Sequence, residues 1–218
     1  MDLRPITELP ASAHPGLKDA VEAVGYICAA DGVHPGSCIR WQTTAILSAG
    51  HVLMNAGLSQ KFMAFFGYNA PTPESVKTRS IFALATSFEG SYFQWQDTAY
   101  ARLGSGHNSK QNTFSLARDR LIEPQAGMRL LVVGYQRVAG QVLKFFSDGA
   151  VTGLRDGRHN LDISASLPEG FSGGAVLTED GRLLGIAKND GTYNGPKVTS
   201  AIAFIEAFEK QMAAAGLM

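Results

Sequence analysis

Short runs of aliphatic, aromatic and β-branched residues alternate with turn residues along most of the chain. Such runs, bounded by Gly, Asp or Asn, are typical of β-strands. In the first half they occupy residues 25–30, 37–41, 44–50, 61–68, 80–88 and 97–103. In the second half they occupy residues 128–135, 141–154, 161–166, 173–178, 182–188 and 197–204. The pattern therefore predicts a turn-rich, all-β chain with two strand-rich halves.

Three segments depart from the strand pattern. We expect an arm at residues 1–15 and then a short helix, whose face at i, i+4 and i+7 is formed by Leu17, Val21 and Val24. A polar segment without a sustained period ends at Pro124 and predicts a connector. After Ser200, a C-terminal helix is predicted from the apolar face of Ala201, Ile205, Phe208 and Met212. The expected units are an arm with helix, a first half, a connector and a second half, at residues 1–24, 25–105, 106–124 and 125–218.

Charge and length limit the classes of partner. The 218 residues include 19 Lys and Arg against 19 Asp and Glu, so no excess of basic charge favours nucleic acid or an anionic membrane. No apolar run approaches the roughly 20 residues of a membrane helix, and the proline-rich N-terminus lacks the apolar stretch of a secretory signal. We expect a soluble, cytoplasmic protein, unless the chain is a mature secreted fragment. The oligomeric state stays open.

The chain has two cysteines, Cys28 and Cys38. They could face each other across a short hairpin, although two buried free thiols are the simpler interpretation. Two cysteines make neither a disulfide framework nor a zinc site of cysteines. We expect no metal and no cofactor.

A serine among three glycines lies in the second half, where residues 169–176 are Glu-Gly-Phe-Ser-Gly-Gly-Ala-Val. Glycines let backbone and substrate approach this serine, Ser172, closely. One hypothesis is a nucleophile whose own N–H, together with that of Gly170, faces the oxygen that becomes negative during acyl transfer. The alternative is a plain glycine-rich hairpin.

A serine nucleophile needs a histidine base that is oriented by a carboxylate. His51 is the candidate base, because it follows the apolar run 45–47 and precedes Val52, a position expected at the end of a buried strand. The remaining histidines are expected at the surface; they are His14, His34, His107 and His159. Asp97 opens the predicted strand 97–103 and is the candidate carboxylate. Taken singly, His51 could be a core histidine and Asp97 a turn residue.

The order of these residues along the chain separates two folds. In α/β-hydrolases the triad runs from serine through the acid to histidine, yet no histidine follows Ser172. The order His51, Asp97, Ser172 is the order of chymotrypsin-like enzymes.

With this order, the chain resembles the trypsin-like (chymotrypsin-fold) serine peptidase family over roughly residues 25–208. Residues 44–51, Thr-Ala-Ile-Leu-Ser-Ala-Gly-His, resemble the family's segment around the catalytic histidine, and residues 36–38, Gly-Ser-Cys, the strand upstream of it. Residues 97–103 resemble the segment of the catalytic aspartate, and residues 170–175 the segment of the catalytic serine. The resemblance implies an all-β fold of two antiparallel six-stranded barrels with a short C-terminal helix. It also implies a serine endopeptidase acting on protein or peptide substrates through His51, Asp97 and Ser172, with the N–H groups of Gly170 and Ser172 as oxyanion hole.

The same resemblance suggests where substrate binds. Ser166, six residues before Ser172, corresponds to the floor of the specificity pocket, and Lys188, Asp190 and Lys197 are candidates for its wall. Phe171 stands where the digestive enzymes have the aspartate that pairs with a newly cut N-terminus, so we expect no activation of that kind. The Lys188 region departs from the family pattern, which keeps a catalytically silent peptide-binding module as the alternative function.

Overall fold

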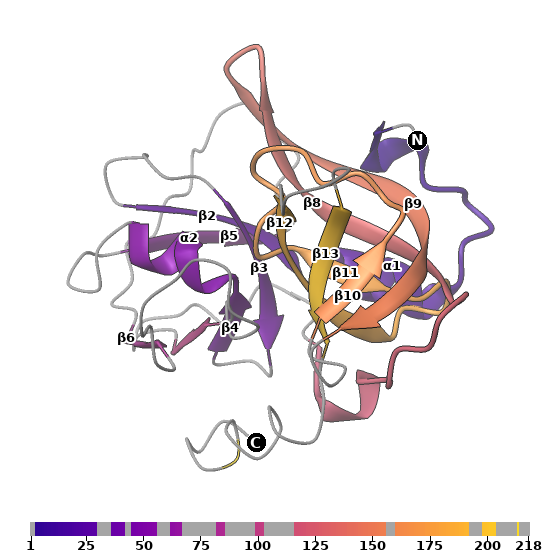
Figure 1. Cartoon of the computed structure of the whole chain (residues 1–218). Helices are drawn as coiled ribbons and strands as arrows, with labels where there is room; N and C mark the ends of the chain where they lie inside the picture. The colour runs from indigo at the N-terminus through magenta and orange to yellow at the C-terminus, as the bar shows by residue number, and fades with distance from the viewer. Residues whose placement is uncertain are drawn as a thin grey trace.

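The structure is a computed structural model. It describes residues 3–29, 36–41, 45–55, 62–66, 82–85, 99–102, 116–155, 160–191, 198–203 and 213, and the structural statements below concern these residues. Within them, no helix has the length and apolar character needed to cross a membrane. Figure 1 shows two groups of strands lying beside each other, with β2 to β6 in one group and β8 to β13 in the other.

The second half of the chain forms a closed ring of antiparallel strands. Its strands are β8 (Arg129–Val138), β9 (Gln141–Arg155), β10 (Asn160–Ile163), β11 (Ala175–Leu177), β12 (Leu183–Gly191) and β13 (Val198–Ala203). They follow the order β9-β10-β13-β12-β11-β8, and β8 pairs again with β9, which closes the ring. Alternate side chains point inward and make an apolar core that includes Leu130, Val132, Leu161, Phe171 and Leu184.

The first half forms a second antiparallel sheet in the order β5-β2-β3-β4-β7-β6. Its strands are β2 (Val24–Ala29), β3 (Gly36–Trp41), β4 (Ala45–Ser48), β5 (Phe62–Phe66), β6 (Phe82–Ala85) and β7 (Ala99–Arg102). Helix α2 (Gly50–Asn55) follows β4 directly. The inner side of this sheet is filled by Ile27, Cys38, Ile46, Val52 and Leu53.

A separate apolar cluster joins the two sheets. It combines Tyr26, Trp41 and Leu47 of the first sheet with Leu131, Tyr135 and Phe146 of the second. Helix α1 (Pro15–Glu22) adds Leu17, Ala20 and Val21 to the same cluster. Burying these side chains holds the two sheets together, because buried apolar surface is the main source of stability.

The N-terminal segment packs on the second sheet. Strand β1 (Arg4–Pro5) pairs with Phe145 and Phe146 of β9, and Arg4 forms an ion pair with Asp148. A short 3-10 turn, η1 (Ile6–Glu8), follows, and His14 caps α1 because its Nδ1 accepts the Gly16 N–H at 3.1 Å. In Figure 1 the indigo strand lies on the side of the molecule opposite α2. The predicted arm therefore packs on the second sheet, away from the helix that carries His51.

All twelve predicted strand regions are confirmed, as is the short helix at Leu17 and Val21, although Val24, also expected on its face, begins β2. The expected position of His51 is wrong: β4 ends at Ser48, and His51 lies in the first turn of α2 instead of at the end of a strand. Ala201, expected in a C-terminal helix, lies in β13, and the remaining positions of that predicted helix lie outside the described residues. Most of the predicted connector also lies outside them, although η2 (Arg118–Arg120) is described.

The cysteines are both buried and free, which confirms the simpler interpretation. Cys28 belongs to the cluster between the sheets, whereas Cys38 belongs to the core inside the first sheet. The two side chains thus point to opposite faces, and this separates the sulfur atoms in space. Burial raises the pKa of the Cys38 thiol, so it stays protonated near neutral pH.

Candidate active site

Ser172 lies on a pair of consecutive tight turns between β10 and β11. In the first turn, the Phe171 N–H donates to the Pro168 carbonyl at 3.1 Å. In the second, the Gly174 N–H donates to the Phe171 carbonyl at 2.8 Å. The third residue of each turn has positive φ, +93° at Gly170 and +88° at Gly173. Because that backbone region favours glycine, the spacing of the two glycines around Ser172 produces this double turn.

The second turn is also fixed to β12. The Gly173 N–H donates to the Ala187 carbonyl at 2.6 Å, and the Ala187 N–H donates to the Gly174 carbonyl at 2.8 Å. Among the described residues, neither the Gly170 N–H nor the Ser172 N–H donates to a backbone carbonyl. The bond from Gly174 to the Phe171 carbonyl fixes the peptide plane that carries the Ser172 N–H. The turn therefore keeps two N–H groups on either side of Phe171 without a backbone acceptor, in a rigid frame.

Phe171 anchors the turn in the second core. Its side chain has no exposed surface and packs among the residues inside the second sheet. A Cβ built at Gly134 would come within 2.8 Å of the Phe171 ring, so the ring fills the space that this glycine leaves. Ser172 itself is only partly buried. The double turn thus buries Phe171 while it leaves Ser172 accessible.

The Ser172 hydroxyl donates a hydrogen bond to the Lys188 carbonyl at 2.7 Å. Lys188 lies at an irregularity of β12, where the pairing with β13 shifts between Ala187 and Asn189. Bulges of this kind re-aim backbone and side-chain groups. The Lys188 ammonium donates to Asn160 Oδ1 at 2.6 Å. The bulge therefore directs the Lys188 carbonyl to Ser172 and its charge toward β10.

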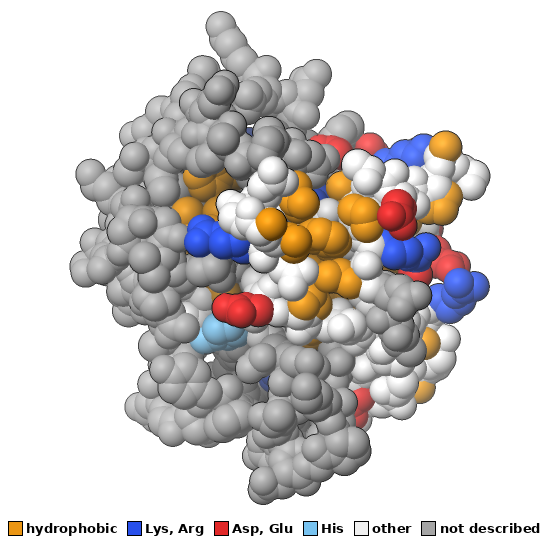
Figure 2. All heavy atoms as spheres, turned by 90° about the horizontal axis from the view of Figure 1, so that it is seen from above, with side chains coloured by type: hydrophobic (Ala, Val, Ile, Leu, Met, Phe, Trp, Pro, Cys, Tyr) orange, Lys and Arg blue, Asp and Glu red, His pale blue; other side chains and the backbone are white. Residues whose placement is uncertain are grey.

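Helix α2, which carries His51, comes close to the Ser172 turn at Gly36. His51 is partly exposed in the first turn of α2, and a Cβ built at Gly36 would meet both Val52 of α2, at 2.6 Å, and the Ser172 carbonyl, at 3.2 Å. The small residue at Gly36 lets α2 and the Ser172 turn come together. Figure 2 shows one histidine side chain at the surface of this face, next to an acidic side chain.

Asp97 lies outside the described residues. The strand that follows it is described: β7 begins at Ala99, and Ala99 pairs with Ser48, three residues before His51. The strand register therefore brings the start of β7 next to the segment that leads to His51.

The proposed substrate residues are described in part. The Ser166 N–H donates to the buried Ser147 hydroxyl at 3.0 Å, and the Ser166 side chain is partly exposed. The backbone of Asp190 belongs to β12, but its side chain, like all of Lys197, lies outside the described residues.

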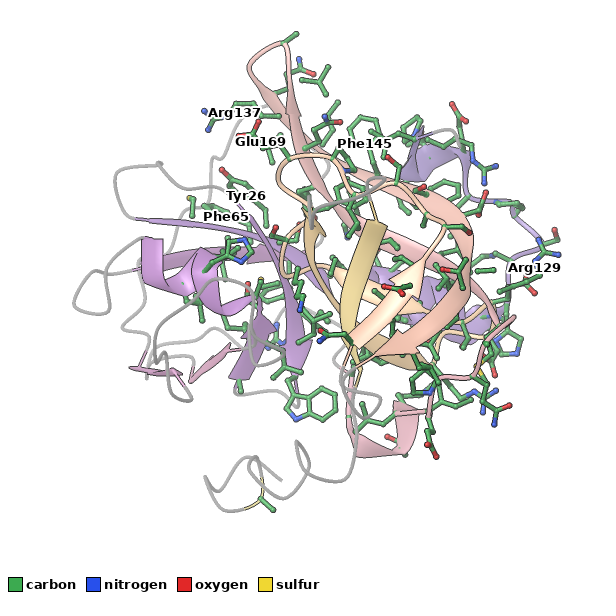
Figure 3. All side chains as sticks on the ribbon, viewed as in Figure 1. Tyr26, Phe65, Arg129, Arg137, Phe145 and Glu169 are labelled. Carbon is green, nitrogen blue, oxygen red and sulfur yellow. The ribbon has the colours of Figure 1, made fainter. Side chains whose placement is uncertain are left out.

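Figure 3 shows Glu169, next to Gly170 in the chain, on the same side of the molecule as Arg137 and Tyr26. The nearby charge of Arg137 partly opposes the rise that burial causes in the pKa of Tyr26.

Sequence reasoning missed two buried serines that hold the site. Ser37 and Ser48 have no exposed surface. The Ser37 N–H donates to the Ser172 carbonyl at 2.8 Å, and the Ser48 hydroxyl donates to the Ser37 carbonyl at 2.8 Å. The signal was present in the sequence: a hydroxyl inside an apolar strand needs a partner. What the sequence could not supply was the identity of the partner.

A buried lysine lies between the sheets. Lys144 donates to the Val21 carbonyl at 2.9 Å, and its ammonium is 5.3 Å from the centre of the Tyr135 ring. Burial lowers the pKa of Lys144 to about 8, and burial raises the pKa of Tyr26 to about 12.

In the described residues, no three His, Cys, Asp or Glu side chains lie close enough together to hold a metal ion.

The sequence matches the trypsin-like peptidase domain over residues 36–186, which is most of the chain. The chain therefore belongs to the trypsin-like peptidase family. No significantly similar sequence was found among curated proteins.

Two solved structures share the fold. A Glu endopeptidase, in complex with MPD, is similar with a TM-score of 0.77 and 17% identity, covering 99% of this chain and 97% of that chain. The serine endoprotease from Yersinia pestis is similar with a TM-score of 0.68 and 17% identity, covering 96% of this chain and 68% of that chain. The expected all-β, chymotrypsin-like fold is confirmed.

Proposed function

We propose that this trypsin-like peptidase is an active serine endopeptidase, with His51, Asp97 and Ser172 as its triad. The observation that carries the proposal is the double turn at Ser172, which holds a partly exposed hydroxyl beside two N–H groups that have no backbone acceptor in the described residues. The proximity of α2 to the Ser172 carbonyl, through Gly36, supports His51 as the base. The pairing of Ala99 with Ser48 supports a role for the nearby Asp97.

The reaction follows from these roles. The Ser172 oxygen attacks the substrate carbonyl while His51 accepts the hydroxyl proton, and Asp97 holds the imidazole in the tautomer that can accept it. The carbonyl oxygen becomes negative and is stabilised by the N–H groups of Gly170 and Ser172. When the C–N bond breaks, His51 returns the proton to the leaving amine, and an ester to Ser172 remains. Water, deprotonated by His51, then hydrolyses this ester and restores the enzyme.

Substrate recognition involves protein or peptide chains bound along β12. Ser166 forms the uncharged floor of the specificity pocket, and Lys188, Asp190 and Lys197 line its wall. The Lys and Asp side chains favour opposite charges on the substrate residue that precedes the cut. A peptide library digested by the wild-type protein identifies this residue directly, and Lys188→Met shows whether the Lys188 charge contributes to the preference.

The test of activity compares the wild-type protein with Ser172→Ala on an unfolded protein substrate such as casein. The wild-type protein should release new N-termini. Triad removal leaves only about 10³–10⁴ over the uncatalysed rate, so Ser172→Ala should release none within the same time. The silent peptide-binding module is favoured by the bond of Ser172 to Lys188, which occupies the hydroxyl proton. Peptide binding without any new N-termini, from folded wild-type protein, would support that alternative and contradict our proposal.

A further inference from the structure

The buried hydroxyl of Ser37 lies where the first sheet, the second sheet and the Ser172 turn meet. Its Oγ donates to the Gly170 carbonyl at 2.7 Å and accepts the Tyr135 N–H at 2.8 Å. The backbone of Ser37 also donates to the Ser172 carbonyl at 2.8 Å. A single residue of β3 thus holds the carbonyls on both sides of Phe171 and connects them to β8.

The geometry requires a group that both donates and accepts at this point. The Tyr135 N–H needs an acceptor and the Gly170 carbonyl needs a donor, and a serine hydroxyl provides both. The Gly170 and Tyr135 backbones lie close together here, because a Cβ built at Gly170 would collide with the Tyr135 carbonyl. Without the hydroxyl, the Tyr135 N–H would lose the hydrogen bond that the Ser37 oxygen accepts. A buried polar group left unpaired costs about 1–3 kcal/mol.

Holding the Gly170 carbonyl limits how Gly170 can turn. Glycine with φ of +93° has no side chain to restrict rotation of the peptide planes that flank it. The Phe171 N–H is held by Pro168 on one edge of the plane that follows Gly170, and Ser37 holds the carbonyl on the other edge. With that plane fixed from both edges, rotation about Gly170 is restrained, and with it the direction of the Gly170 N–H.

We propose that the Ser37 side chain is a positioning residue that orders the oxyanion hole through the Gly170 carbonyl. This inference rests on the proposed function, in which the Gly170 N–H stabilises the negative oxygen. Ser37 does not touch the substrate. It acts by setting the backbone of the Ser172 turn before substrate binds, which is the preorganisation that electrostatic catalysis requires.

The test measures the rate of labelling of Ser172 at a series of fluorophosphonate concentrations. The curve gives a maximal rate constant and the concentration at which half of that rate is reached. Ser37→Ala should lower the maximal rate constant about tenfold or more, because loss of one oxyanion donor outright costs about 10²–10³. The half-saturating concentration should change little. Ser37→Cys keeps a weak donor and acceptor and should give an intermediate rate constant. It is the second variant for the same test if Ser37→Ala does not fold.

The matched control is Ser164→Ala. The Ser164 hydroxyl also accepts a backbone N–H, that of Ala150 at 2.9 Å, but it lies just after β10, and its described hydrogen bonds go to Ala150 and not to the Ser172 turn. It should lower stability by a similar amount and leave the rate constant unchanged. The maximal rate constant is calculated for the fraction of molecules that can react. If Ser37→Ala or Ser37→Cys then equals wild type, the inference is wrong and Ser37 contributes to stability alone.

Hydrogen exchange separates this inference from the proposed function. Amide exchange in residues 168–174 should be faster in Ser37→Ala than in wild type or Ser164→Ala, whether or not the protein is active. A folded wild-type protein that does not react defeats the proposed function. Unchanged exchange in a reactive protein defeats the role of Ser37 instead.

Discussion

The Ser172 Oγ and the Lys188 carbonyl oxygen lie 2.7 Å apart, so the proposed nucleophile donates its proton to β12. To serve as a nucleophile, the hydroxyl must rotate and donate to His51 instead. Exchanging one hydrogen bond for another changes the free energy by about 1 kcal/mol, which is small against the 8 kcal/mol or more, roughly, that enzymes remove from a barrier. The bond to Lys188 is therefore compatible with catalysis, and it fixes the position of the Ser172 oxygen on the turn.

Asp97→Asn should lower turnover by about 10⁴, as the same change does in the chymotrypsin-fold example of this triad. The amide keeps a hydrogen bond but selects the wrong tautomer of His51, and activity should recover in part at high pH. Casein hydrolysis over a pH series measures this effect. Asp119→Asn and Asp162→Asn are matched controls, because Asp119 is exposed on η2 and the Asp162 carboxylate packs beside Gly153 of β9. A large loss in either control, with none at Asp97, would reassign the carboxylate.

Gly170→Ala should slow fluorophosphonate labelling far more than Gly140→Ala. Both glycines have positive φ, +93° and +80°, so both substitutions introduce backbone strain of about 1 kcal/mol. Only at Gly170 would the new Cβ collide with the Tyr135 carbonyl, whereas nothing lies within 4 Å at Gly140. Labelling rates and melting temperatures of both variants separate strain from collision. Equal labelling by the two variants would show that the Gly170 backbone does not shape the site.

The protein beginning at Met1 should react with a fluorophosphonate without prior cleavage. Phe171 is fully buried in the second core and holds the turn from the start, and β1 is already paired with β9. Labelling rates before and after limited digestion with immobilised trypsin should agree, with intact mass checked in each sample. If labelling requires a cut near the N-terminus, the packing of Phe171 is not sufficient to order the turn.

Lys144 should make stability depend on pH between 8 and 10.5. Its pKa is about 8 in the folded protein and 10.5 in the unfolded chain, so the unfolded chain binds more protons in this window and its contribution to stability rises with pH. At roughly 1.4 kcal/mol per pKa unit, the rise is up to about 3 kcal/mol. Urea unfolding gives the free energy of unfolding of wild type and of Lys144→Met at each pH. The value for wild type should rise relative to that of Lys144→Met as pH increases.

The comparison with Lys144→Met is needed because other groups titrate nearby. Burial raises the pKa values of Cys38 and Tyr26, so their contributions fall as pH rises above 9 and 10, the values of the unfolded chain. The Tyr26 contribution is common to both proteins and cancels in the difference. The Cys38 contribution cancels only in part, because the charge of Lys144 lowers the pKa of this thiol and is absent from Lys144→Met. Lys18→Met, on an exposed lysine, is the matched substitution. A difference between wild type and Lys144→Met that stays constant from pH 8 to 10.5 would contradict the account.

The strands and the order of the site residues could be predicted from the sequence because both are local in the chain. A run of β-branched and aromatic residues between turn residues predicts a strand without knowledge of the neighbouring strand with which it pairs. The glycines around Ser172 likewise specify positive φ where the turns need it. Helix α2 could not be predicted, since its six residues are too short to show a helical period and continue the apolar run of β4. Packing of Val52 and Leu53 inside the first sheet stabilises it.

The supporting contacts could not be predicted because they join residues far apart in the chain. The Ser37 hydroxyl reaches Gly170 and Tyr135, and the Lys144 ammonium reaches the Val21 carbonyl. Each contact depends on how the two sheets and α1 pack together, which no single segment specifies. The two-residue strand β1 was missed for the same reason: its pairing with β9 is long-range, and Pro5 disfavours a strand prediction.

The central claim, that Ser172 is an activated nucleophile, is tested most directly by mapping a fluorophosphonate adduct on the intact protein by mass spectrometry. The account predicts one adduct per molecule, on the peptide that contains Ser172, and none in folded Ser172→Ala. That variant should keep the melting temperature close to that of wild type, because it removes one partly exposed hydroxyl. A folded wild-type protein that forms no adduct, or an adduct that persists in Ser172→Ala, would contradict the account.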